Sequence, residues 1–328
     1  MATPDAATLA RQVRDGDRRA LGRAITLIES SRPDDREVAR ALLDILAPYA
    51  GNSIRVGISG APGVGKSTSI EALGNYVIEQ GHKVAVLAVD PSSAISGGSI
   101  LGDKTRMEIL SRRTEAFIRP SPSGETLGGV ARRTRETMQV VEAAGFDVVL
   151  VETVGVGQSE TEVSRMTDMF MLLLLPSGGD ELQGIKRGIV ELADFIIVNK
   201  ADGDTKAAAE RTASDYRNAL RLLHPRSENW QVPVTSYSAL DDKETGDIWQ
   251  TVCDYRDTLT TSGEIQARRS AQASDWMWSE VTDTLLDRFK LNDAVKAKIN
   301  ELETAVIAGE VSPTAAAKTL IEAFLANQ

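Results

Sequence analysis

The chain of 328 residues has little of what secreted, membrane and transition-metal proteins depend on. One cysteine, Cys253, excludes a disulfide framework, and with only two histidines, His82 and His224, a soft transition-metal site is not expected. The longest apolar run, Met169 to Leu175, is far too short to cross a bilayer, and the N-terminus lacks the apolar core of a signal peptide. A net charge of −10 disfavours non-specific binding to nucleic acid. We therefore expect a cytoplasmic protein that binds neither membranes nor nucleic acid.

The apolar residues divide the chain into three regions. Residues 1–52 and 262–328 are charged and show helical spacing, so we expect helical extensions at both ends. Residues 53–261 alternate short apolar runs with helical patterns, which predicts an α/β domain with a mainly parallel sheet flanked by helices. Seven strands are predicted, at 54–59, 84–89, 115–119, 147–152, 169–175, 195–199 and 232–236.

A glycine-rich loop lies between the first predicted strand and a predicted helix. Residues 60–67 read Gly-Ala-Pro-Gly-Val-Gly-Lys-Ser, the pattern of a phosphate-binding loop. Backbone N–H groups in such a loop surround phosphate oxygens, while Lys66 brings charge to the terminal phosphates and Ser67 can bind Mg²⁺. A chance match in a glycine-rich turn is disfavoured by the flanking strand and helix. The predicted phosphate site comprises Gly60, Ala61, Pro62, Gly63, Val64, Gly65, Lys66, Ser67 and Thr68.

A second motif predicts which base is bound. Residues 199–202 read Asn-Lys-Ala-Asp and follow the apolar run 195–198. The carboxylate of Asp202 can accept hydrogen bonds from guanine N1–H and the 2-amino group, and adenine has neither donor there. Lys200 can lay its apolar stem on the base, and Asn199 can tie neighbouring loops together. Taken alone, the tetrapeptide would be a helix N-cap after a strand, but downstream of a phosphate-binding loop it predicts guanine.

A third segment fits the same base. The predicted strand 232–236 is followed by a turn that contains Ser238, Ala239 and Leu240. Backbone N–H groups in this turn can donate to guanine O6. By itself the turn would be an ordinary loop, so its interpretation depends on the first two motifs.

Acidic residues at strand ends predict a magnesium site. Glu152 ends the strand 147–152 and can hold Mg²⁺ through water, and the N–H of Gly155 can meet the γ-phosphate. An acid that is merely solvated at a strand end is the alternative. The strand 84–89 follows the phosphate-loop helix directly, so we expect it parallel to and beside strand 54–59, with Asp90 at the carboxyl edge. Asp103, in a glycine-rich stretch, can order around the metal, although an ordinary flexible loop is also possible there.

Taken together, these motifs resemble those of the MeaB/ArgK family of P-loop GTPases, over about residues 20–300. The resemblance implies a homodimeric GTPase of the signal-recognition/MinD-like class that binds GTP, GDP and Mg²⁺. It also implies a partner, the adenosylcobalamin-dependent methylmalonyl-CoA mutase, which the GTPase would chaperone by gating cofactor loading and by protecting or reactivating the enzyme. The segments that carry the resemblance are 60–68, 89–92, 102–107, 151–158, 179–186 and 199–202.

The resemblance also implies residue roles. Lys66, Ser67 and Thr68 would hold phosphates and Mg²⁺, and Asp202 would recognise guanine. Residues 177–186 resemble a switch loop of the family, in which Asp180, Gln183 and Lys186 would relay to the partner. The candidate catalytic residues are Lys66, Asp90, Glu152 and Lys186, and the candidate metal ligands are Ser67, Asp90, Asp103 and Glu152.

The residues around Gly155 predict slow hydrolysis. In Ras-like proteins a glutamine directly after the equivalent glycine orients the attacking water. That place is Val156 here, and Gln158 lies two residues later. We expect slow intrinsic turnover that a partner accelerates by ordering the switch loops.

Two other classes of function stay open at this point. A P-loop kinase acting on an amino acid or a transport component would need a lid, and the arginines at 112–113 and 132–135 offer one, although solvated helix faces are the preferred interpretation. A nucleotide-gated scaffold without meaningful catalysis is the second. The Asn-Lys-x-Asp motif argues against ATP as the substrate.

Apolar stripes in the terminal regions need partners. Either they pack on the nucleotide domain or they form a homodimer arm with the stripe from Val295 to Val306 as its seam, and we favour the dimer. Pro313 after Ser312 predicts a last helix. The stripes are Leu21–Ile25–Ile28, Val38–Leu42–Ile45, Trp276–Val281–Leu285–Phe289 and Val295–Ile299–Leu302–Val306.

Overall fold

The computed structural model describes seven stretches of the chain and separates it into two compact units. The units are Met1–Arg269 and Ser270–Gln328, and each is considered by itself. The described residues are 5–30, 32–89, 107–120, 127–153, 159–176, 187–223 and 225–326. Within these stretches, no helix is both long and apolar enough to span a membrane.

Unit 1 is built on one parallel sheet in the order β3-β2-β4-β1-β5-β6-β7. All seven predicted strands are present. The last begins later than expected because Pro233, which has no N–H to donate, precedes it. The strands are β1 (Ile54–Gly60), β2 (Val84–Val89), β3 (Ala116–Arg119), β4 (Val148–Thr153), β5 (Met169–Leu174), β6 (Phe195–Val198) and β7 (Val234–Ser236).

The predicted place of the second strand was wrong. β2 runs parallel to β1 but does not lie beside it, because β4 is inserted between them and pairs with both. Ile58 of β1 is therefore in register with Glu152 of β4. This order brings the acidic end of β4, rather than the end of β2, next to the strand that leads into the phosphate-binding loop.

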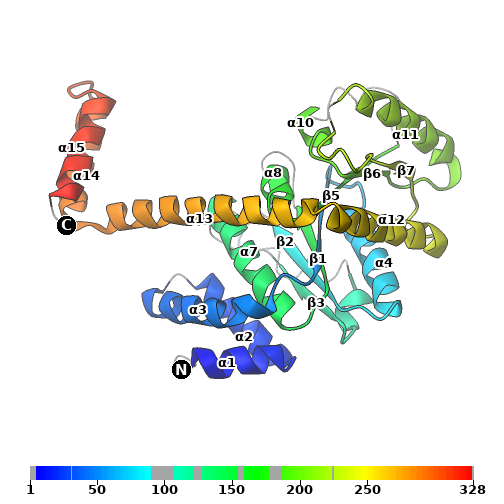
Figure 1. The fold of residues 1–328 in the computed structure, drawn as a ribbon. Coiled ribbons are helices and arrows are strands. Elements are labelled where there is room, and N and C mark those ends of the chain that lie inside the picture. The colour runs from blue at the N-terminus through cyan, green and yellow to red at the C-terminus, as the bar shows by residue number, and fades with distance from the viewer. Residues whose placement is uncertain are drawn as a thin grey trace. The chain divides into compact units, whose positions relative to one another are not determined.

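Helices cover both faces of the sheet. On one face lie α4 and α12, and on the other lie α7, α8, α10 and α11 with the N-terminal helices packed on α7 (Figure 1). The helices of this unit are α1 (Ala6–Arg14), α2 (Arg18–Glu29), α3 (Pro33–Leu46), α4 (Lys66–Glu79), α7 (Leu127–Ala143), α8 (Ser159–Ser164), α10 (Arg187–Val190), α11 (Lys206–Leu220) and α12 (Asp242–Thr261), with 3₁₀ turns at Ala47–Tyr49, Leu110–Arg112 and Gly203–Thr205.

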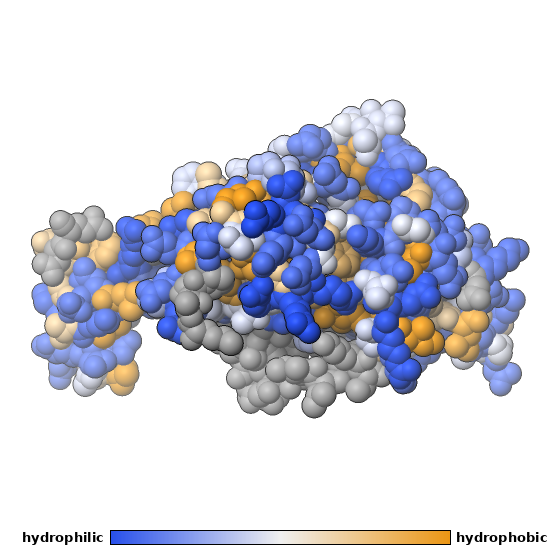
Figure 2. Space-filling view, turned by 90° about the horizontal axis from the view of Figure 1, so that it is seen from below, coloured by the Kyte–Doolittle hydropathy of each residue, from blue (hydrophilic) through white to orange (hydrophobic). Residues whose placement is uncertain are grey.

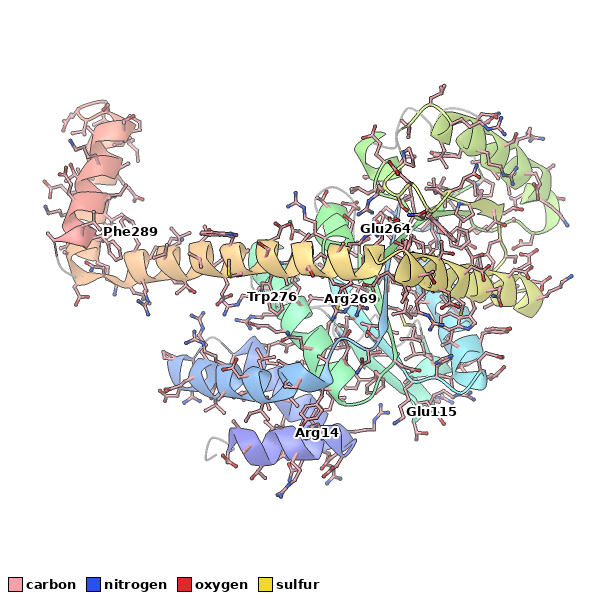
Figure 3. All side chains as sticks on the ribbon, in the orientation of Figure 1. Arg14, Glu115, Glu264, Arg269, Trp276 and Phe289 are labelled. Carbon is pink, nitrogen blue, oxygen red and sulfur yellow. The ribbon has the colours of Figure 1, made fainter. Side chains whose placement is uncertain are left out.

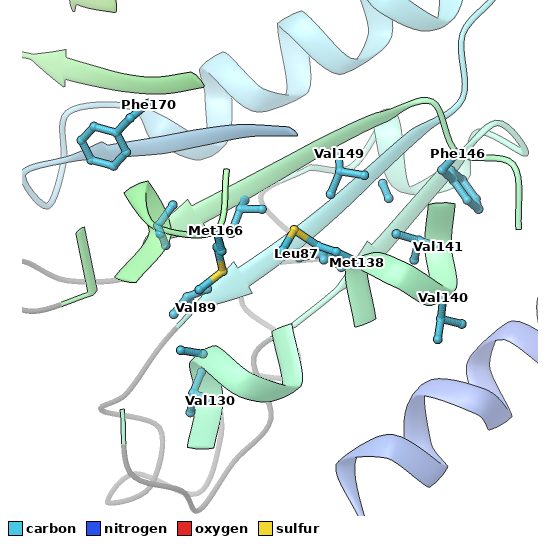
Figure 4. Close-up of a cluster of buried hydrophobic side chains, with 14 of the residues drawn as sticks. Leu87, Val89, Val130, Met138, Val140, Val141, Phe146, Val149, Met166 and Phe170 are labelled. Carbon is cyan, nitrogen blue, oxygen red and sulfur yellow. The ribbon is translucent and has the colours of Figure 1, made fainter. Parts of the chain in front are cut away.

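The core alternates along β2, β4, β5 and β6, as burial on both faces requires. Leu87 and Val89 point to the α7 side, where they meet Val130 and Met138 (Figure 4), while Val86 faces α4. Because successive side chains of a strand point to opposite faces, each apolar run supplies both clusters. This explains why the strands read as continuous hydrophobic segments.

The N-terminal helices form part of the same core. Leu21, Ile25 and Ile28 are buried as predicted, whereas the predicted face of α3 is partly wrong, because Ile45 is 39 % exposed. The buried positions of α3 are Ala39, Leu42 and Leu46. The third buried residue is an alanine, Ala39, and the prediction missed it because it was based on large apolar side chains.

The amino edge of the sheet is closed by buried ion pairs. Asp168, just before β5, is fully buried and accepts hydrogen bonds from Arg269 Nε at 2.7 Å and Nη2 at 2.6 Å. Its carboxylate also accepts from the Arg55 backbone N–H at 2.8 Å. Arg269 belongs to the first turns of α13, near Glu264 (Figure 3). Next to this pair, Asp194 accepts from Arg268 at 3.1 Å.

Glu142 forms the second buried pair at this edge. Its carboxylate accepts from Arg55 Nε at 2.7 Å, from Arg55 Nη2 at 2.8 Å and from the Gly51 N–H at 2.7 Å. Burial alone would raise the pKa of Glu142, but the hydrogen bond and charge of Arg55, with the hydrogen bonds from Ser53 and Gly51, hold it below its ordinary value. The pair therefore stays charged although it is shielded from water.

Unit 2 contains most of α13 (Glu264–Leu291), α14 (Asp293–Ile307) and α15 (Pro313–Leu325). As predicted, α15 begins with Ser312, whose hydroxyl accepts from the Ala315 N–H, and with proline at the first turn. α14 packs on α15, and the rings of Phe289 and Phe324 meet edge to face at 5.5 Å. Only Val295 and Ala316 are buried among the described residues of α13, α14 and α15.

Candidate functional site

The phosphate-binding loop joins the carboxyl end of β1 to the N-terminus of α4. Gly63 and Gly65 adopt φ of 80° and 97°, a left-handed conformation that favours glycine. Lys66 Nζ donates to Gly60 O at 2.7 Å and to Ala61 O at 3.3 Å, so its charge is kept within the loop. The N-terminus of α4 adds positive potential at the same place. The loop thus gathers N–H groups, a helix dipole and an ammonium group, which together suit an anion.

Ser67 and Glu152 come together because β4 lies beside β1. Ser67 Oγ donates to Glu152 Oε1 at 3.1 Å, and Glu152 is 4 % exposed. Beneath them, the buried hydroxyl of Thr153 donates to Ser59 Oγ at 2.9 Å. A hydroxyl and a carboxylate are hard oxygen ligands of the kind that Mg²⁺ takes together with substrate phosphates. Within the described residues, no cluster of three His, Cys, Asp or Glu side chains offers a metal site.

Asn199 joins the phosphate-binding loop to the segment after β6. Its Nδ2 donates to Val64 O at 2.7 Å and to Ser69 Oγ at 3.2 Å. The approach is close, since a Cβ on Gly65 would lie 2.6 Å from Nδ2. Within the described part of the chain, the buried Oδ1 atom of Asn199 has no hydrogen-bond partner. One side-chain amide therefore fixes the distance between the two loops.

The segments 199–202 and 237–240 lie side by side. The Ala201 N–H donates to Tyr237 O at 3.0 Å, and Ser238 Oγ donates to Asp202 Oδ2 at 2.8 Å. Lys200 has φ of 58°, the one non-glycine residue with positive φ among those described. The hydroxyl of Ser238 takes one lone pair of Asp202 and leaves the carboxylate further capacity to accept hydrogen bonds.

The three backbone N–H groups predicted to donate to guanine O6 differ in whether they already have an acceptor within the protein. The Ser238 N–H donates to Glu244 Oε2 at 2.6 Å, and the Leu240 N–H donates to Ser238 Oγ at 3.3 Å. The Ala239 N–H has no acceptor among the described residues. The sequence reasoning missed Glu244, although Asp241 followed by Glu244 has the spacing of a helix-capping box and marked the start of α12.

Several predicted site residues lie outside the described ranges. They are Asp90, Asp103, Gly155 and Lys186, with Val156, Gln158, Asp180 and Gln183 of the predicted switch segments.

A parallel sheet with a glycine-rich phosphate loop after β1 and Asn-Lys-x-Asp after β6 defines the class of P-loop GTPases. The chain belongs to one family of that class: residues 21–294 match the family model described as "Methylmalonyl Co-A mutase-associated GTPase MeaB". The protein is therefore a GTPase, a GTP hydrolase, and binds guanine nucleotides.

Relatives cover nearly the whole chain. A protein of Caulobacter vibrioides is 57 % identical over 309 residues, which cover 94 % of each chain. The mouse "Methylmalonic aciduria type A homolog, mitochondrial" is 47 % identical over 319 residues, covering 94 % of this chain and 77 % of the mouse protein. Escherichia coli "GTPase ArgK" is 46 % identical over 325 residues, covering 98 % of each chain.

A solved structure has the same fold. The crystal structure of a protein described as "LAO/AO transport system kinase" superposes with a TM-score of 0.76 at 38 % identity, covering 98 % of both chains. This likeness extends over both the GTPase fold and the terminal helices, and it confirms the predicted fold class.

Proposed function

We propose that this GTPase acts as a chaperone of the adenosylcobalamin-dependent methylmalonyl-CoA mutase, gating cofactor loading and protecting or reactivating that enzyme. The observation that carries the proposal is the match of residues 21–294 to a family described as mutase-associated. The name of the mouse relative, which refers to methylmalonic aciduria, supports it. Adenosylcobalamin is assigned to the partner. A cytoplasmic location remains a prediction.

The guanine pocket proposed here uses the two joined loops. Asp202 would accept from guanine N1–H and the 2-amino group, Ala239 N–H would donate to O6, and Lys200 would cover the base. The bonds from Ser238 to Asp202 and from Asn199 to Val64 support this arrangement, because they hold base and phosphate segments together. Asp202→Asn replaces one acceptor by a donor, so the variant should lose GTP and gain xanthosine triphosphate. An unchanged preference for GTP, measured by competition binding, would remove Asp202 from this role.

The magnesium site is proposed at Ser67 and Glu152. Their 3.1 Å hydrogen bond shows that both oxygens reach one point beside the phosphate-binding loop. When bound, Mg²⁺ would neutralise charge on the phosphates during hydrolysis. Asp90 and Asp103 as further ligands, and Gly155 and Lys186 at the γ-phosphate and switch, remain proposals from the sequence, as do the region boundaries at 52/53 and 261/262.

A homodimer is proposed through the C-terminal helices. Val295 of the predicted seam is already buried within one chain, where α14 packs on α15, so the exposed apolar side chains of α13 and α15 support the proposal instead. Met277, Trp278 and Leu285 of α13 are 54 %, 63 % and 53 % exposed, which is unusual for large apolar side chains that follow one helix. Ile321 and Leu325 of α15 are also exposed, and orange patches appear on the corresponding helices at the left of Figure 2. Light scattering on the wild-type protein and on Trp278→Asp tests this. A wild-type monomer at micromolar concentration would contradict the proposal.

The mutase partnership is tested by association and by turnover. We expect the GTPase and the mutase to co-elute in gel filtration, and the elution to change between GTP and GDP. Phosphate release in a single turnover should be slow for the GTPase alone and faster with mutase. Release that the mutase does not alter, together with separate elution in every nucleotide state, would contradict the chaperone role. A rate of many turnovers per second for the isolated protein would contradict the predicted dependence on a partner.

A kinase is the second candidate because the solved relative is described as a transport system kinase. Two of the arginines that could form a kinase lid are instead paired with nearby acids: Arg132 with Glu136 at 3.2 Å, and Arg135 with Glu162 at 3.4 Å. Incubation with γ-labelled GTP and free amino acids separates the two functions. Label on an amino acid would favour the kinase, and label only in free phosphate the GTPase.

A further inference from the structure

The loop that follows β7 is held by hydrogen bonds that leave one backbone N–H without an acceptor among the described residues. Tyr237 N–H donates to Val198 O at 2.9 Å, and Asp241 N–H donates to Ser238 O at 3.1 Å. Ser238 N–H donates to Glu244, and Leu240 N–H to Ser238 Oγ. Of the five N–H groups from residue 237 to residue 241, only that of Ala239 lacks an acceptor within the described structure.

Glu244 is placed to fold this loop. It lies in the first turn of α12, where Asp241 Oδ1 caps the N–H groups of Lys243 at 2.9 Å and Glu244 at 3.3 Å. The Glu244 side chain reaches back past Asp241 and takes Ser238 N–H at 2.6 Å, a charge-assisted hydrogen bond. A second link fixes the same turn, since Tyr237 Oη and Thr245 Oγ1 lie 3.1 Å apart in the interior.

Two chemical consequences follow from this bond. With Ser238 N–H occupied, the turn presents the Ala239 N–H as its donor, and a donor there favours a 6-keto purine over the 6-amino group of adenine. The same bond fixes Ser238, whose hydroxyl donates to Asp202 Oδ2 at 2.8 Å. The carboxylate of Glu244 on α12 thus supports the side of the proposed pocket that would bind O6.

We propose that Glu244 is a positioning residue for guanine recognition, which sets the Ala239 N–H toward O6 without itself touching the nucleotide. This inference rests on the guanine pocket proposed above. In Glu244→Ala, Ser238 N–H loses its acceptor, the turn relaxes and the O6 donor is misplaced. GTP and inosine triphosphate, which share O6, should then lose affinity together, whereas ATP should not.

Competition binding with a fluorescent guanine nucleotide tests this on the full-length protein with Mg²⁺. For Glu244→Ala we expect GTP and inosine triphosphate each to bind about tenfold more weakly, which corresponds to the loss of one neutral hydrogen bond, that from the Ala239 N–H to O6. The ratio of GTP to inosine triphosphate affinity should stay unchanged, because the 2-amino contact belongs to Asp202. Glu244→Gln keeps a carbonyl acceptor and should restore affinity to within about threefold.

Glu210→Ala is the matched control, since Glu210 accepts from Ser236 Oγ at 2.6 Å just before the same turn but binds none of its N–H groups. It should leave all three affinities unchanged. Equal affinities of Glu244→Ala and wild type for GTP would overturn the proposal, and so would an equal loss for GTP and ATP, the mark of a merely structural role. Failure of the wild type to bind GTP would instead contradict the pocket itself.

Discussion

The two edges of the sheet in unit 1 are built on opposite principles. At the amino edge, Asp168, Asp194 and Glu142 are buried and each carboxylate is matched by arginine and backbone N–H groups. At the carboxyl edge, Lys66 rests on loop carbonyls, and the buried Asn199 Oδ1 has no hydrogen-bond partner in the described structure. One edge is closed by paired charges, and the other carries the polar groups of the proposed nucleotide site.

The difference follows from topology. In a parallel sheet all strands present the same end at one edge, and loops at the carboxyl ends converge on a ligand. The amino edge has no such task, so its charges can be paired permanently. Activity should therefore be sensitive at one edge and stability at the other.

The largest expected effect is the loss of Asp168. Asp168→Ala leaves Arg269 and the Arg55 N–H without their acceptor in the interior and should lower the free energy of unfolding by about 3–5 kcal/mol. Urea denaturation of the purified variant measures this. Asp257→Ala removes the exposed partner of Arg256 and should cost less than about 1 kcal/mol. Equal effects of the two variants would show that the amino edge is not specially stabilised.

Loss of Lys66 should produce the converse pattern. Lys66→Ala removes the ammonium from the phosphate-binding loop, and we expect GTP hydrolysis to fall by about a hundredfold or more, or about 3 kcal/mol. The melting temperature without nucleotide should change little. Lys206→Ala is the control, because Lys206 also begins a helix after a strand but is exposed outside the loop. A variant that hydrolyses GTP normally would contradict the assignment.

The smallest effect concerns pH. Since the pKa of Glu142 lies below its ordinary value in the folded protein, its contribution to stability is complete above the unfolded pKa, near 4.5, and is lost as pH falls through the folded pKa. Denaturation midpoints of the wild type should therefore decline below about pH 4.5. The variant Glu142→Gln should be less stable than the wild type at neutral pH. Its denaturation midpoint should fall less steeply below pH 4.5, because it lacks the carboxylate that becomes protonated. Parallel pH profiles would mean that the Arg55–Glu142 pair does not supply this dependence.

The sequence predicted individual strands and loops better than it predicted which strands lie side by side. Each strand of unit 1 follows from an apolar run bounded by polar residues, and the loop before Lys66 follows from its glycines. The insertion of β4 between β1 and β2 did not follow, because strand order depends on which crossovers the helices permit. The wrong face of α3 arose where Ala39, not a large residue, fills the core.

Most of the contacts that the sequence did not predict join residues far apart in the chain or depend on the folded turn. Arg269 and Asp168 are 101 positions apart, and neither lies in a motif. Glu244 was missed because its acceptor role depends on a turn that only the folded chain forms. By contrast, Asn199 and Asp202 were singled out because their side-chain chemistry is specific for the proposed ligand, whatever the details of the surrounding fold.

The contact between Gly65 and Asn199 joins the phosphate-binding loop to the segment that carries Asp202. A methyl group on Gly65 would occupy the space of the Asn199 amide, 2.6 Å away, and would also strain a backbone with φ of 97°. The displaced amide belongs to the segment that carries Asp202. Gly65→Ala should therefore disturb the segment that carries Asp202, the proposed guanine-binding residue, as well as the phosphate-binding loop itself.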